Sequence, residues 1–362
     1  MQLHLVGGFL GSGKTTAIAA ACKLLAARKL TAGVITNDLG KYLVDTAFFD
    51  LQKIPAVQVT NGCFCCNYDD LTARLDQLVR AVQPDVVFAE SVGSCADVVA
   101  TVIKPLQELE QAAGGNATLT VFTDVRLFSP WLAGEELPFS ENVMYIFAKQ
   151  IEEAGLLVLN KRDLISPERA HTALEGARNR FTGKQIRLQN SLDQFQVETW
   201  LKDLNVMQSK PSTLQSLYLD YNRYADGEAA LGWLDAHLVF LIPAGGNLKQ
   251  LAVDWIAGMS HELRNRKIGI GNLKLMLQAG AVEGMVSLTA GDTAGWRAQV
   301  PDLKGKHLLA LVNVRVEADP SVVHEVVLQA AQTCAAKVQG QVEEKDAEAF
   351  RPGFPKPQRR MA

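Results

Sequence analysis

A glycine-rich run near the start of the chain has the residue types needed to bind phosphate. Its glycines let consecutive backbone N–H groups face phosphate oxygens. A lysine adds positive charge near the β- and γ-phosphates, and the following threonine hydroxyl can ligate Mg²⁺. An apolar segment precedes the run and an alanine-rich one follows, which predicts strand, phosphate loop and helix rather than a turn that binds nothing. The candidate phosphate contacts are Gly8, Gly11, Ser12, Gly13, Lys14, Thr15 and Thr16.

A second motif, Asn160-Lys161-Arg162-Asp163, follows an apolar strand-like segment. The Asp163 carboxylate can accept hydrogen bonds from the guanine ring N–H and exocyclic amine, two donors that adenine lacks. Asn160 completes the motif, and the aliphatic stem of Lys161 can lie on the base. Asp163 could instead cap the helix expected from Ser166. The motif favours GTP and GDP as ligands over adenine nucleotides.

Two acids stand where strands are expected to end. Glu90 closes the apolar segment 85–90 and opens an E-x-x-G motif. It could hold or orient a Mg²⁺ water, while Gly93 senses the γ-phosphate through its backbone N–H. Asp38, after the second strand, could approach the metal or the attacking water, or form a plain Asx turn. Lys14, Asp38 and Glu90 are therefore the candidate catalytic residues. None of them is an obvious strong base, so we expect slow hydrolysis that relies on positioning.

Three cysteines, Cys63, Cys65 and Cys66, crowd into four positions. Three thiols at this spacing can converge on a soft ion such as Zn²⁺, which binds them as thiolates. A closed structural zinc site needs four ligands, so an incomplete site suits metal transfer. Buried inert thiols, a redox pair, and a structural zinc site completed from elsewhere remain as alternatives. Cys22, Cys95 and Cys334 are predicted to be small buried side chains.

The place of the cysteines in the chain also bears on function. They lie between the segment 37–45 and Glu90, both of which are expected to respond to the γ-phosphate. A metal loop in this position should change shape when GTP is hydrolysed. Metal affinity and nucleotide affinity would then be linked, and that linkage must be reciprocal.

Composition narrows the function classes. The 362 residues carry 36 basic and 39 acidic side chains, a formal charge of −3, which argues against a dedicated nucleic-acid binder. No apolar run reaches the roughly 18–20 residues that span a bilayer. The phosphate loop begins almost at once, so the N-terminus does not resemble a signal peptide. We expect a cytoplasmic protein without a membrane or nucleic-acid partner.

Strand-like and helix-like patterns alternate through residues 1–204, which predicts an α/β domain with a mostly parallel sheet. A polar, proline-containing segment at 205–215 is the expected linker. Residues 216–348 have a rhythm close to β-α-β-β-α-β with one extra strand, which predicts a smaller α+β domain of ferredoxin-like type. The tail 349–362 is rich in proline and arginine and should be extended, either as an idle end or as a docking segment.

Taken together, these motifs resemble the CobW-type metallochaperone GTPases, relatives of the nickel-insertion GTPases for urease and hydrogenase. The resemblance covers roughly residues 1–200, and the stretch Gln150–Ala154 also resembles the family in sequence. The order of phosphate loop, cysteine trio and guanine motif is highly specific. The matching pieces are residues 7–16, 37–40, 62–66, 90–93 and 160–163.

The resemblance implies a P-loop NTPase fold, slow GTP hydrolysis, and Mg²⁺ at Thr15 with Glu90. It also implies Zn²⁺ or Co²⁺ at the three cysteines and delivery of metal, or of a metal cofactor, to a client metalloprotein. A homodimer is possible. Asp38 stands where the family usually has Glu, and Phe64 replaces an aliphatic residue. Two alternatives stay open: a GTP-dependent assembly factor for a cobalamin or corrinoid protein, and a regulator whose thiols sense metal or oxidation.

Overall fold

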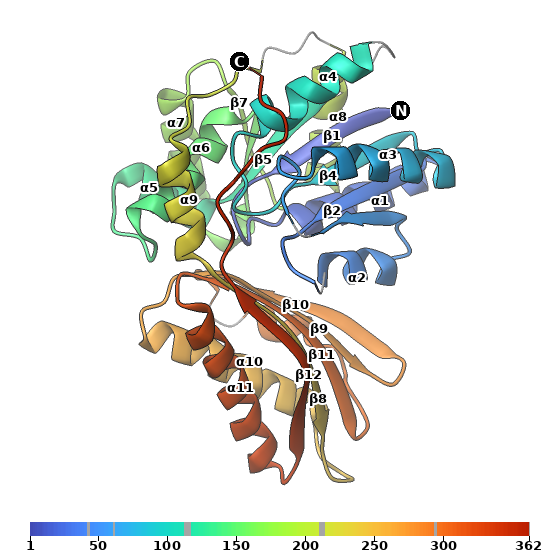
Figure 1. The fold of residues 1–362 in the computed structure, drawn as a ribbon, viewed down its shortest axis with the longest axis vertical. Helices are drawn as coiled ribbons and strands as arrows, with labels where there is room; N and C mark the ends of the chain where they lie inside the picture. The colour runs from blue at the N-terminus through green and yellow to red at the C-terminus, as the bar shows by residue number, and fades with distance from the viewer. Residues whose placement is uncertain (42–43, 61, 112–116, 210–213, 293–294, 362) are drawn as a thin grey trace.

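The computed structural model describes residues 1–41, 44–60, 62–111, 117–209, 214–292 and 295–361. Within them the strands form two sheets, one of seven strands and one of five. The sheets lie one above the other along the long axis of the molecule (Figure 1). This arrangement confirms the predicted α/β class with an additional α+β part.

The first sheet is parallel throughout and has the order β3-β2-β4-β1-β5-β6-β7. Parallel strands place their carboxyl ends at one edge, where ligands of open α/β sheets bind. Val6 pairs with Glu90, so the phosphate loop and the E-x-x-G motif leave the sheet side by side. The strands are β1 Gln2–Gly7, β2 Ala32–Asn37, β3 Ala56–Val59, β4 Val86–Glu90, β5 Thr118–Asp124, β6 Leu156–Asn160 and β7 Gln185–Leu188.

Helices cover both faces of this sheet (Figure 1). The helix-like pattern of the sequence over 94–112 predicts a helix there, but the helix begins later, as a π-helix at Val99–Ile103 that continues into α4. The residues before it form a turn in which Asp97 has φ 65°, and position 112 lies outside the described residues. The helices are α1 Lys14–Ala27, α2 Val44–Leu51, α3 Tyr68–Val82, α4 Lys104–Gln111, α5 Val125–Ala133, α6 Glu141–Glu153, α7 Pro167–Arg180, α8 Gln194–Gln208 and α9 Tyr221–Ala230.

The second sheet is antiparallel with the order β10-β9-β11-β8-β12. Two helices cover one of its faces, and the other face meets the first part of the molecule (Figure 1). The predicted extra strand is β10, which extends a ferredoxin-like sheet at the edge beside β9. The elements are β8 Gly232–Leu241, α10 Leu248–Asn265, β9 Ile270–Ala279, β10 Val282–Leu288, β11 His307–Val316, α11 Pro320–Lys337 and β12 Gln341–Phe350.

The segment between the sheets belongs spatially to the first one. Helix α9 packs along α6, and Tyr224 and Leu219 are buried in a small cluster there. The division into 1–204, 216–348 and 349–362 stays a prediction, and residues 210–213 of the expected linker lie outside the described part. After β12 the chain runs back across the first sheet to its end (Figure 1).

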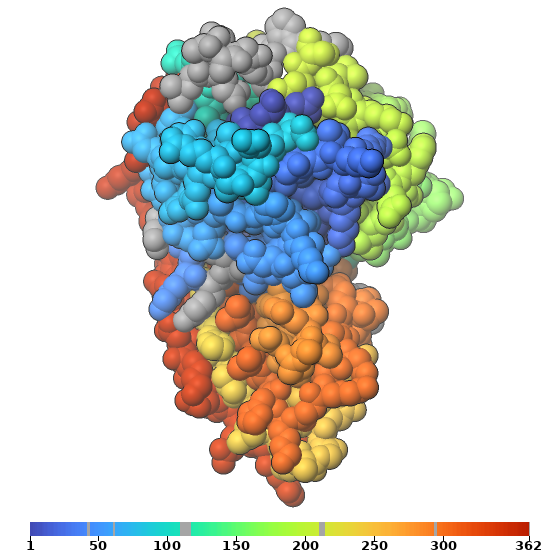
Figure 2. Space-filling view, turned by 90° about the vertical axis from the view of Figure 1, so that its right-hand side faces the viewer, coloured from blue at the N-terminus to red at the C-terminus, as the bar shows by residue number. Residues whose placement is uncertain are grey.

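The space-filling view shows the early, blue-coloured residues resting on the orange strands of the second sheet (Figure 2). Each part has its own apolar core, built around buried residues such as Phe88 and Trp200 in one and Trp255 and Phe240 in the other. Among the described residues, no helix combines the length and the hydropathy needed to cross a membrane.

Candidate nucleotide and metal site

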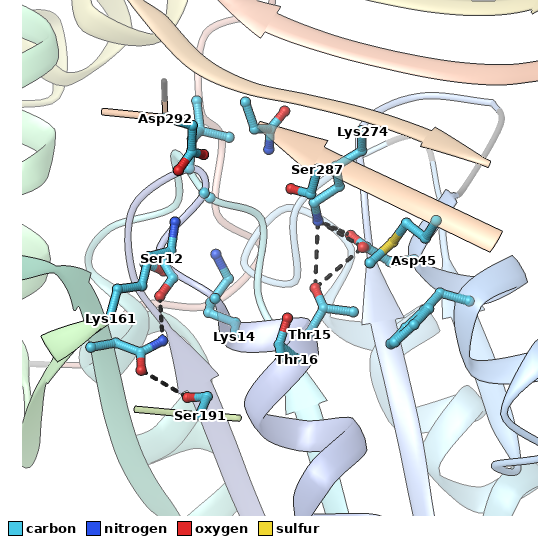
Figure 3. Close-up of a pocket in the computed structure, with 18 of the residues that line it drawn as sticks. Ser12, Lys14, Thr15, Thr16, Asp45, Lys161, Ser191, Lys274, Ser287 and Asp292 are labelled. Carbon is cyan, nitrogen blue, oxygen red and sulfur yellow. Dashed lines mark hydrogen bonds and ion pairs between the residues drawn. The ribbon is translucent and has the colours of Figure 1, made fainter. Parts of the chain in front are cut away.

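A pocket of about 570 Å³ opens at the carboxyl edge of the parallel sheet, where the second sheet covers it. This volume is in the range of small-ligand sites. Gly8 is outside its lining, but the Gly8 carbonyl accepts a 2.7 Å hydrogen bond from the Lys14 ammonium. Of the residues predicted from the sequence, the pocket is lined by Gly11, Ser12, Gly13, Lys14, Thr15, Thr16, Asp38, Glu90, Gly93, Asn160, Lys161 and Asp163 (Figure 3).

The phosphate loop is fixed by close backbone packing. Gly13 precedes α1 with φ 91°, and a Cβ there would lie 2.5 Å from Asn160 Nδ2. That amide donates to the Ser12 carbonyl at 2.8 Å, while Asn160 Oδ1 accepts from Ser191 at 2.8 Å. Gly11, with φ 69°, faces the second sheet, where a Cβ would lie 2.8 Å from the Gly271 carbonyl oxygen. The guanine motif and the second sheet therefore both hold the loop.

Lys14 points into the pocket from the first turn of α1 (Figure 3). Burial lowers the pKa of its ammonium to about 8, although Glu90 acts in the opposite direction. The ammonium now bonds to the Gly8 carbonyl and, at 3.4 Å, to the Phe9 carbonyl. These two carbonyls carry no net charge, so an anion in the pocket would give the buried lysine a partner of opposite charge.

Three oxygen-bearing side chains meet beside Lys14. Thr15 Oγ1 lies 2.9 Å from Glu90 Oε1 and 3.2 Å from Asp45 Oδ1. Burial, and then the nearby Asp45 carboxylate, raise the pKa of Glu90 to about 7. Its second oxygen, Oε2, is buried and has no hydrogen-bond partner among the described residues. A hydroxyl and two carboxylates fit the ligand preference of Mg²⁺.

The sequence analysis missed two members of this corner. Asp45 lies in the first turn of α2, in the segment 37–45 whose residues 42–43 are outside the described part. An acidic residue in a segment that was expected to respond to the γ-phosphate could have identified it. Lys274 comes from β9 of the second sheet, with Nζ 2.6 and 2.7 Å from the Asp45 oxygens and 3.4 Å from Thr15 Oγ1 (Figure 3). Nothing in its local sequence pointed to the pocket.

Asp38 lines the pocket, but its carboxylate faces the second sheet. Asp38 Oδ1 is 3.0 Å from Arg315 Nη2, which is also 2.7 Å from Asp235 Oδ1. Burial raises the pKa of Asp38, and Arg315 opposes that rise. In this arrangement Asp38 links the two sheets, and its role toward a metal or an attacking water stays a prediction.

The guanine end of the pocket is more open. Asp163 is exposed, in a short 3-10 turn over Arg162–Leu164. Lys161 has φ 63°, and its ammonium lies 3.0 Å from Asp124 Oδ2. Asp124 also caps α5 by accepting from the Arg126 N–H at 2.9 Å. The stem of Lys161 is thereby held along the pocket wall, where a planar base could rest on it (Figure 3).

The three predicted metal-binding cysteines converge. The Cys63, Cys65 and Cys66 sulfurs lie within 4.8 Å of one another. The first two are buried, and Cys66 is partly exposed. The Cys65–Cys66 sulfur distance of 3.8 Å matches thiolates around a tetrahedral zinc ion with Zn–S bonds of about 2.3 Å. Cys63 and Cys65, at 2.7 Å, would have to separate as a metal enters.

A fourth thiol lies against this cluster. Cys95 is buried two residues after Gly93, and the neighbouring thiols of Cys63 and Cys65 lower its pKa to about 6. The thiols of Cys63, Cys66 and Cys95 in turn raise the pKa of Cys65. Cys95 is buried as expected, but the expectation did not foresee its proximity to the trio, which follows β3, whereas Cys95 follows β4 on the other side of β2.

One pocket residue holds the cysteine loop directly. Asn37, at the end of β2, donates to the Val59 carbonyl at 3.1 Å and to the Gly62 carbonyl at 2.8 Å. Its side-chain oxygen accepts from the Phe64 N–H at 2.9 Å. Because Asn37 also lines the nucleotide pocket, a single amide connects the pocket to the segment that carries the thiols.

Helix α6 secures the loop that leads to Cys95. Gln150 donates to the carbonyls of Gly93 and Cys95 at 3.0 and 2.9 Å. Glu153 accepts from the Val99 N–H at 3.2 Å, and burial raises the pKa of Glu153 to about 8. The stretch Gln150–Ala154, which resembles the family in sequence, therefore holds the loop of the E-x-x-G motif in place.

Comparison with known families agrees with this geometry. The family described as "CobW/HypB/UreG, nucleotide-binding domain" matches residues 2–188, more than half of the chain. The chain belongs to the CobW/HypB/UreG family. The resemblance inferred from the motifs is thereby confirmed.

Characterised relatives in this family align with the same region. The chain is 32% identical over 176 residues to zinc chaperone YeiR of Escherichia coli, an alignment covering 46% of this chain and 48% of that protein. It is 26% identical over 181 residues to zinc chaperone CobW of Sinorhizobium sp, covering 44% and 51%. Urease accessory protein UreG of Mycobacteroides abscessus is 31% identical over 170 residues, covering 44% and 63%. The chain thus spans less than two thirds of each of these relatives.

Solved structures of the family give a looser match. HypB from Helicobacter pylori, crystallised in complex with nickel, is 17% identical with a TM-score of 0.43, covering 59% of this chain and 91% of that one. HypB from Archaeoglobus fulgidus is also 17% identical, with a TM-score of 0.41, and covers 57% of this chain and 90% of that one.

Proposed function

We propose that this family member is a GTP-hydrolysing metallochaperone. It would carry Zn²⁺ or Co²⁺ on Cys63, Cys65 and Cys66, and deliver the ion, or a metal cofactor, to a client protein when its nucleotide state changes. The observation that carries the proposal is Asn37, which lines the nucleotide pocket and also hydrogen-bonds on both sides of the cysteine loop.

Nucleotide selection would come from the two sequence motifs. The phosphate loop offers backbone N–H groups and the buried Lys14 ammonium to the phosphates. Asp163 would accept from the guanine ring N–H and exocyclic amine, and Asn160 holds the Ser12 carbonyl so that loop and base site stay in register. Adenine would leave the Asp163 carboxylate without donors.

Hydrolysis would rest on charge placement. Thr15, Glu90 and Asp45 are the side chains that would hold Mg²⁺, which when bound neutralises charge on the phosphates. Lys14 adds a second positive charge, and Gly93 offers its N–H close to Glu90. The pocket carboxylates Asp38, Asp45 and Glu90 are already paired with Arg315, Lys274 and Thr15, so slow turnover is expected.

Metal handling would use the thiol cluster. Cys66 is the partly exposed member, so it marks the side of the cluster from which an ion could pass to a client. Cys95 adds a buried thiol from the loop that follows Gly93, which gives the γ-phosphate a second route to the cluster. The names of two relatives, zinc chaperones, favour Zn²⁺ over Co²⁺. Such a chaperone would work in the cytoplasm.

The proposal is tested by measuring zinc affinity with GDP and with a non-hydrolysable GTP analogue, using a competing chelator. We expect the wild-type affinity to differ by about tenfold between the two states, and the Asn37→Ala variant to show no difference. Asn67→Ala is the matched control: its amide donates to the Thr60 carbonyl of the same loop but does not line the pocket. Equal wild-type affinities in the two states would refute the proposal.

A further inference from the structure

Lys274 of the second sheet reaches a position that a metal ion should occupy. We propose that its ammonium takes the place of Mg²⁺ in the nucleotide-free protein, and that Mg²⁺ entering with GTP displaces it. The inference rests on the proposed nucleotide site and adds a regulatory role for the second sheet. In this proposal the second sheet responds to the binding of a divalent cation through Lys274.

The contacts of the ammonium support this assignment. Lys274 Nζ is bound by both oxygens of Asp45, at 2.6 and 2.7 Å, and lies 3.4 Å from Thr15 Oγ1. Thr15 Oγ1 is in turn 2.9 Å from Glu90 Oε1. The cation thus sits among the oxygens that the divalent ion would use. Its side chain is only 15% exposed, so little water screens the charge.

Electrostatics makes the two cations mutually exclusive. The Lys274 ammonium forms an ion pair with Asp45, with Nζ 2.6 Å from Oδ1, so a positive charge already lies on these oxygens. A divalent ion on the same oxygens would repel that charge at close range, in surroundings of low dielectric. An incoming triphosphate supplies new negative charge, and the displaced ammonium can pair with it.

Displacement would be felt across the second sheet. Lys274 pairs with Asn313 on β11, and Asn313 Oδ1 accepts from the Val44 N–H at the start of α2, 3.2 Å away. Two residues further along β11, Arg315 bridges Asp38 and Asp235. Movement of Lys274 therefore disturbs a continuous set of bonds between α2, the loop after β2 and the second sheet, which gives that sheet a way to signal nucleotide state.

The test uses Mn²⁺ as a spin-active substitute for Mg²⁺ and no nucleotide. We expect the wild-type protein to bind Mn²⁺ weakly in EPR titrations, and Lys274→Met, which keeps the aliphatic stem, to bind it at least about tenfold more tightly. Lys274→Arg keeps the charge and should behave like the wild type. Lys274→Gln provides a second neutral variant in case the first unfolds.

Equal Mn²⁺ affinity in the wild-type, neutral and charged variants would overturn the inference. Because GTP is absent from the titration, this result is separable from a failure of the proposed function. A protein that bound Mn²⁺ as expected but did not bind GTP would refute the proposed function and leave the role of Lys274 intact.

A different observation concerns the chain after β12. Residues 355–361 lie along the cysteine loop and the start of α3, as the red segment in Figure 1 indicates. The Lys356 N–H donates to Cys66 Sγ at 3.3 Å, and the Gln358 N–H to the Cys65 carbonyl at 2.9 Å. The sequence left open whether this tail is idle or docks, and these contacts favour docking.

Charged contacts anchor the same segment at its far end. Arg359 lies over the Tyr68 ring, 4.7 Å from the centroid, and its guanidinium is 3.2 Å from Asp69. Arg360 reaches Asp97, whose side chain is 1% exposed, at 2.8 Å. We infer that residues 355–361 form a strap over the thiol cluster, and that the ion leaves quickly only when the strap lifts.

The strap is tested through a single hydrogen bond. Lys356→Pro removes the N–H that faces Cys66, while Lys356→Ala keeps it and removes only the exposed side chain. Zinc transfer to a colorimetric chelator should be about three- to tenfold faster in the proline variant than in the alanine variant or the wild type. Equal rates in all three would overturn the inference. An Arg360→Ala variant, which should also release zinc faster, checks the strap through an independent contact.

Discussion

The nucleotide pocket and the thiol cluster are built in opposite ways. The pocket gathers polar and charged side chains from distant segments, among them Thr15, Glu90 and Lys274, and pairs cations with acids. The cluster takes three ligands from four consecutive positions and sits in the apolar core with Phe64 and Tyr68. The charges of the pocket are therefore fixed by its own side chains, whereas a metal that binds the cluster must displace protons from its thiols.

This difference gives each region its own sensitivity. Because the pocket has its charges in place, loss of one lysine should weaken anion binding without altering the thiols. Because the cluster depends on the charge of its cargo, metal binding there should release protons and favour alkaline pH. The comparison can be broken or sharpened by variants that act on one region only.

The largest effect is expected from Cys65→Ser. Cys65 is the central member of the trio, close to both Cys63 and Cys66. A hydroxyl does not ionise to replace a thiolate, so zinc affinity should fall by at least about 1000-fold. GTP affinity should remain at the wild-type level. Chelator competition measures the first and calorimetry the second, with Cys22→Ser as the buried-cysteine control.

A smaller loss should follow from Lys14→Ala. Removing the buried ammonium takes away the charge that faces the phosphates, and GTP affinity should fall by about 100-fold. Zinc affinity of the nucleotide-free protein should not change, because Lys14 has no contact with the cysteine loop among the described residues. A large change in both affinities would contradict the separation of the two regions.

Cys95→Ser should have an intermediate effect that refines the comparison. If Cys95 supports the cluster from the loop after Gly93, zinc affinity should fall by about tenfold, and the difference between GDP and GTP-analogue states should shrink. Cobalt absorption in the thiolate charge-transfer region would report the number of sulfur ligands. A variant spectrum identical to that of the wild type would show that Cys95 never joins the metal.

The smallest effect on either site is expected from Glu153→Gln, which acts on stability. The pKa of Glu153 rises from its ordinary value to about 8 in the folded protein. The contribution of Glu153 to the free energy of unfolding is therefore fully present below about pH 4.5 and is lost as pH rises through 8. The glutamine variant should match the wild type near pH 5 and be more stable by about 1–3 kcal/mol at pH 9. Thermal unfolding at both values checks this, and parallel curves would contradict it.

Local chemistry was predictable from the sequence. The strand alternation, the phosphate loop and the cysteine spacing are short-range patterns, and the structure contains the expected parallel sheet and ferredoxin-like sheet. Two helices give weak sequence signals for physical reasons. Helix α2 has only eight residues, and α5 carries Pro130 inside it, a residue that ordinarily argues against a helix.

Contacts between distant segments were not predictable. Lys274 lies on a strand whose pattern shows only that it is half-buried, and its role depends on how the two sheets meet. Cys95 is separated from the cysteine trio by all of α3 and β4, and only the packing of the loops at the carboxyl edge of the sheet brings it close. Tertiary packing decides such partners, so a single sequence without structure contains no local sign of them.

The close approach of Gly11 to Gly271 has a practical consequence. A Cβ at Gly11 would lie 2.8 Å from the Gly271 carbonyl oxygen, so the two parts of the molecule leave no room for a methyl group at this contact. Chimeras that exchange the C-terminal half between family members should work only with a glycine at position 271, where a Cβ would lie 2.6 Å from Leu10 Cδ1 and 2.9 Å from the Arg315 carbonyl oxygen. Engineers who wish to retarget such proteins by swapping halves should preserve this pair first.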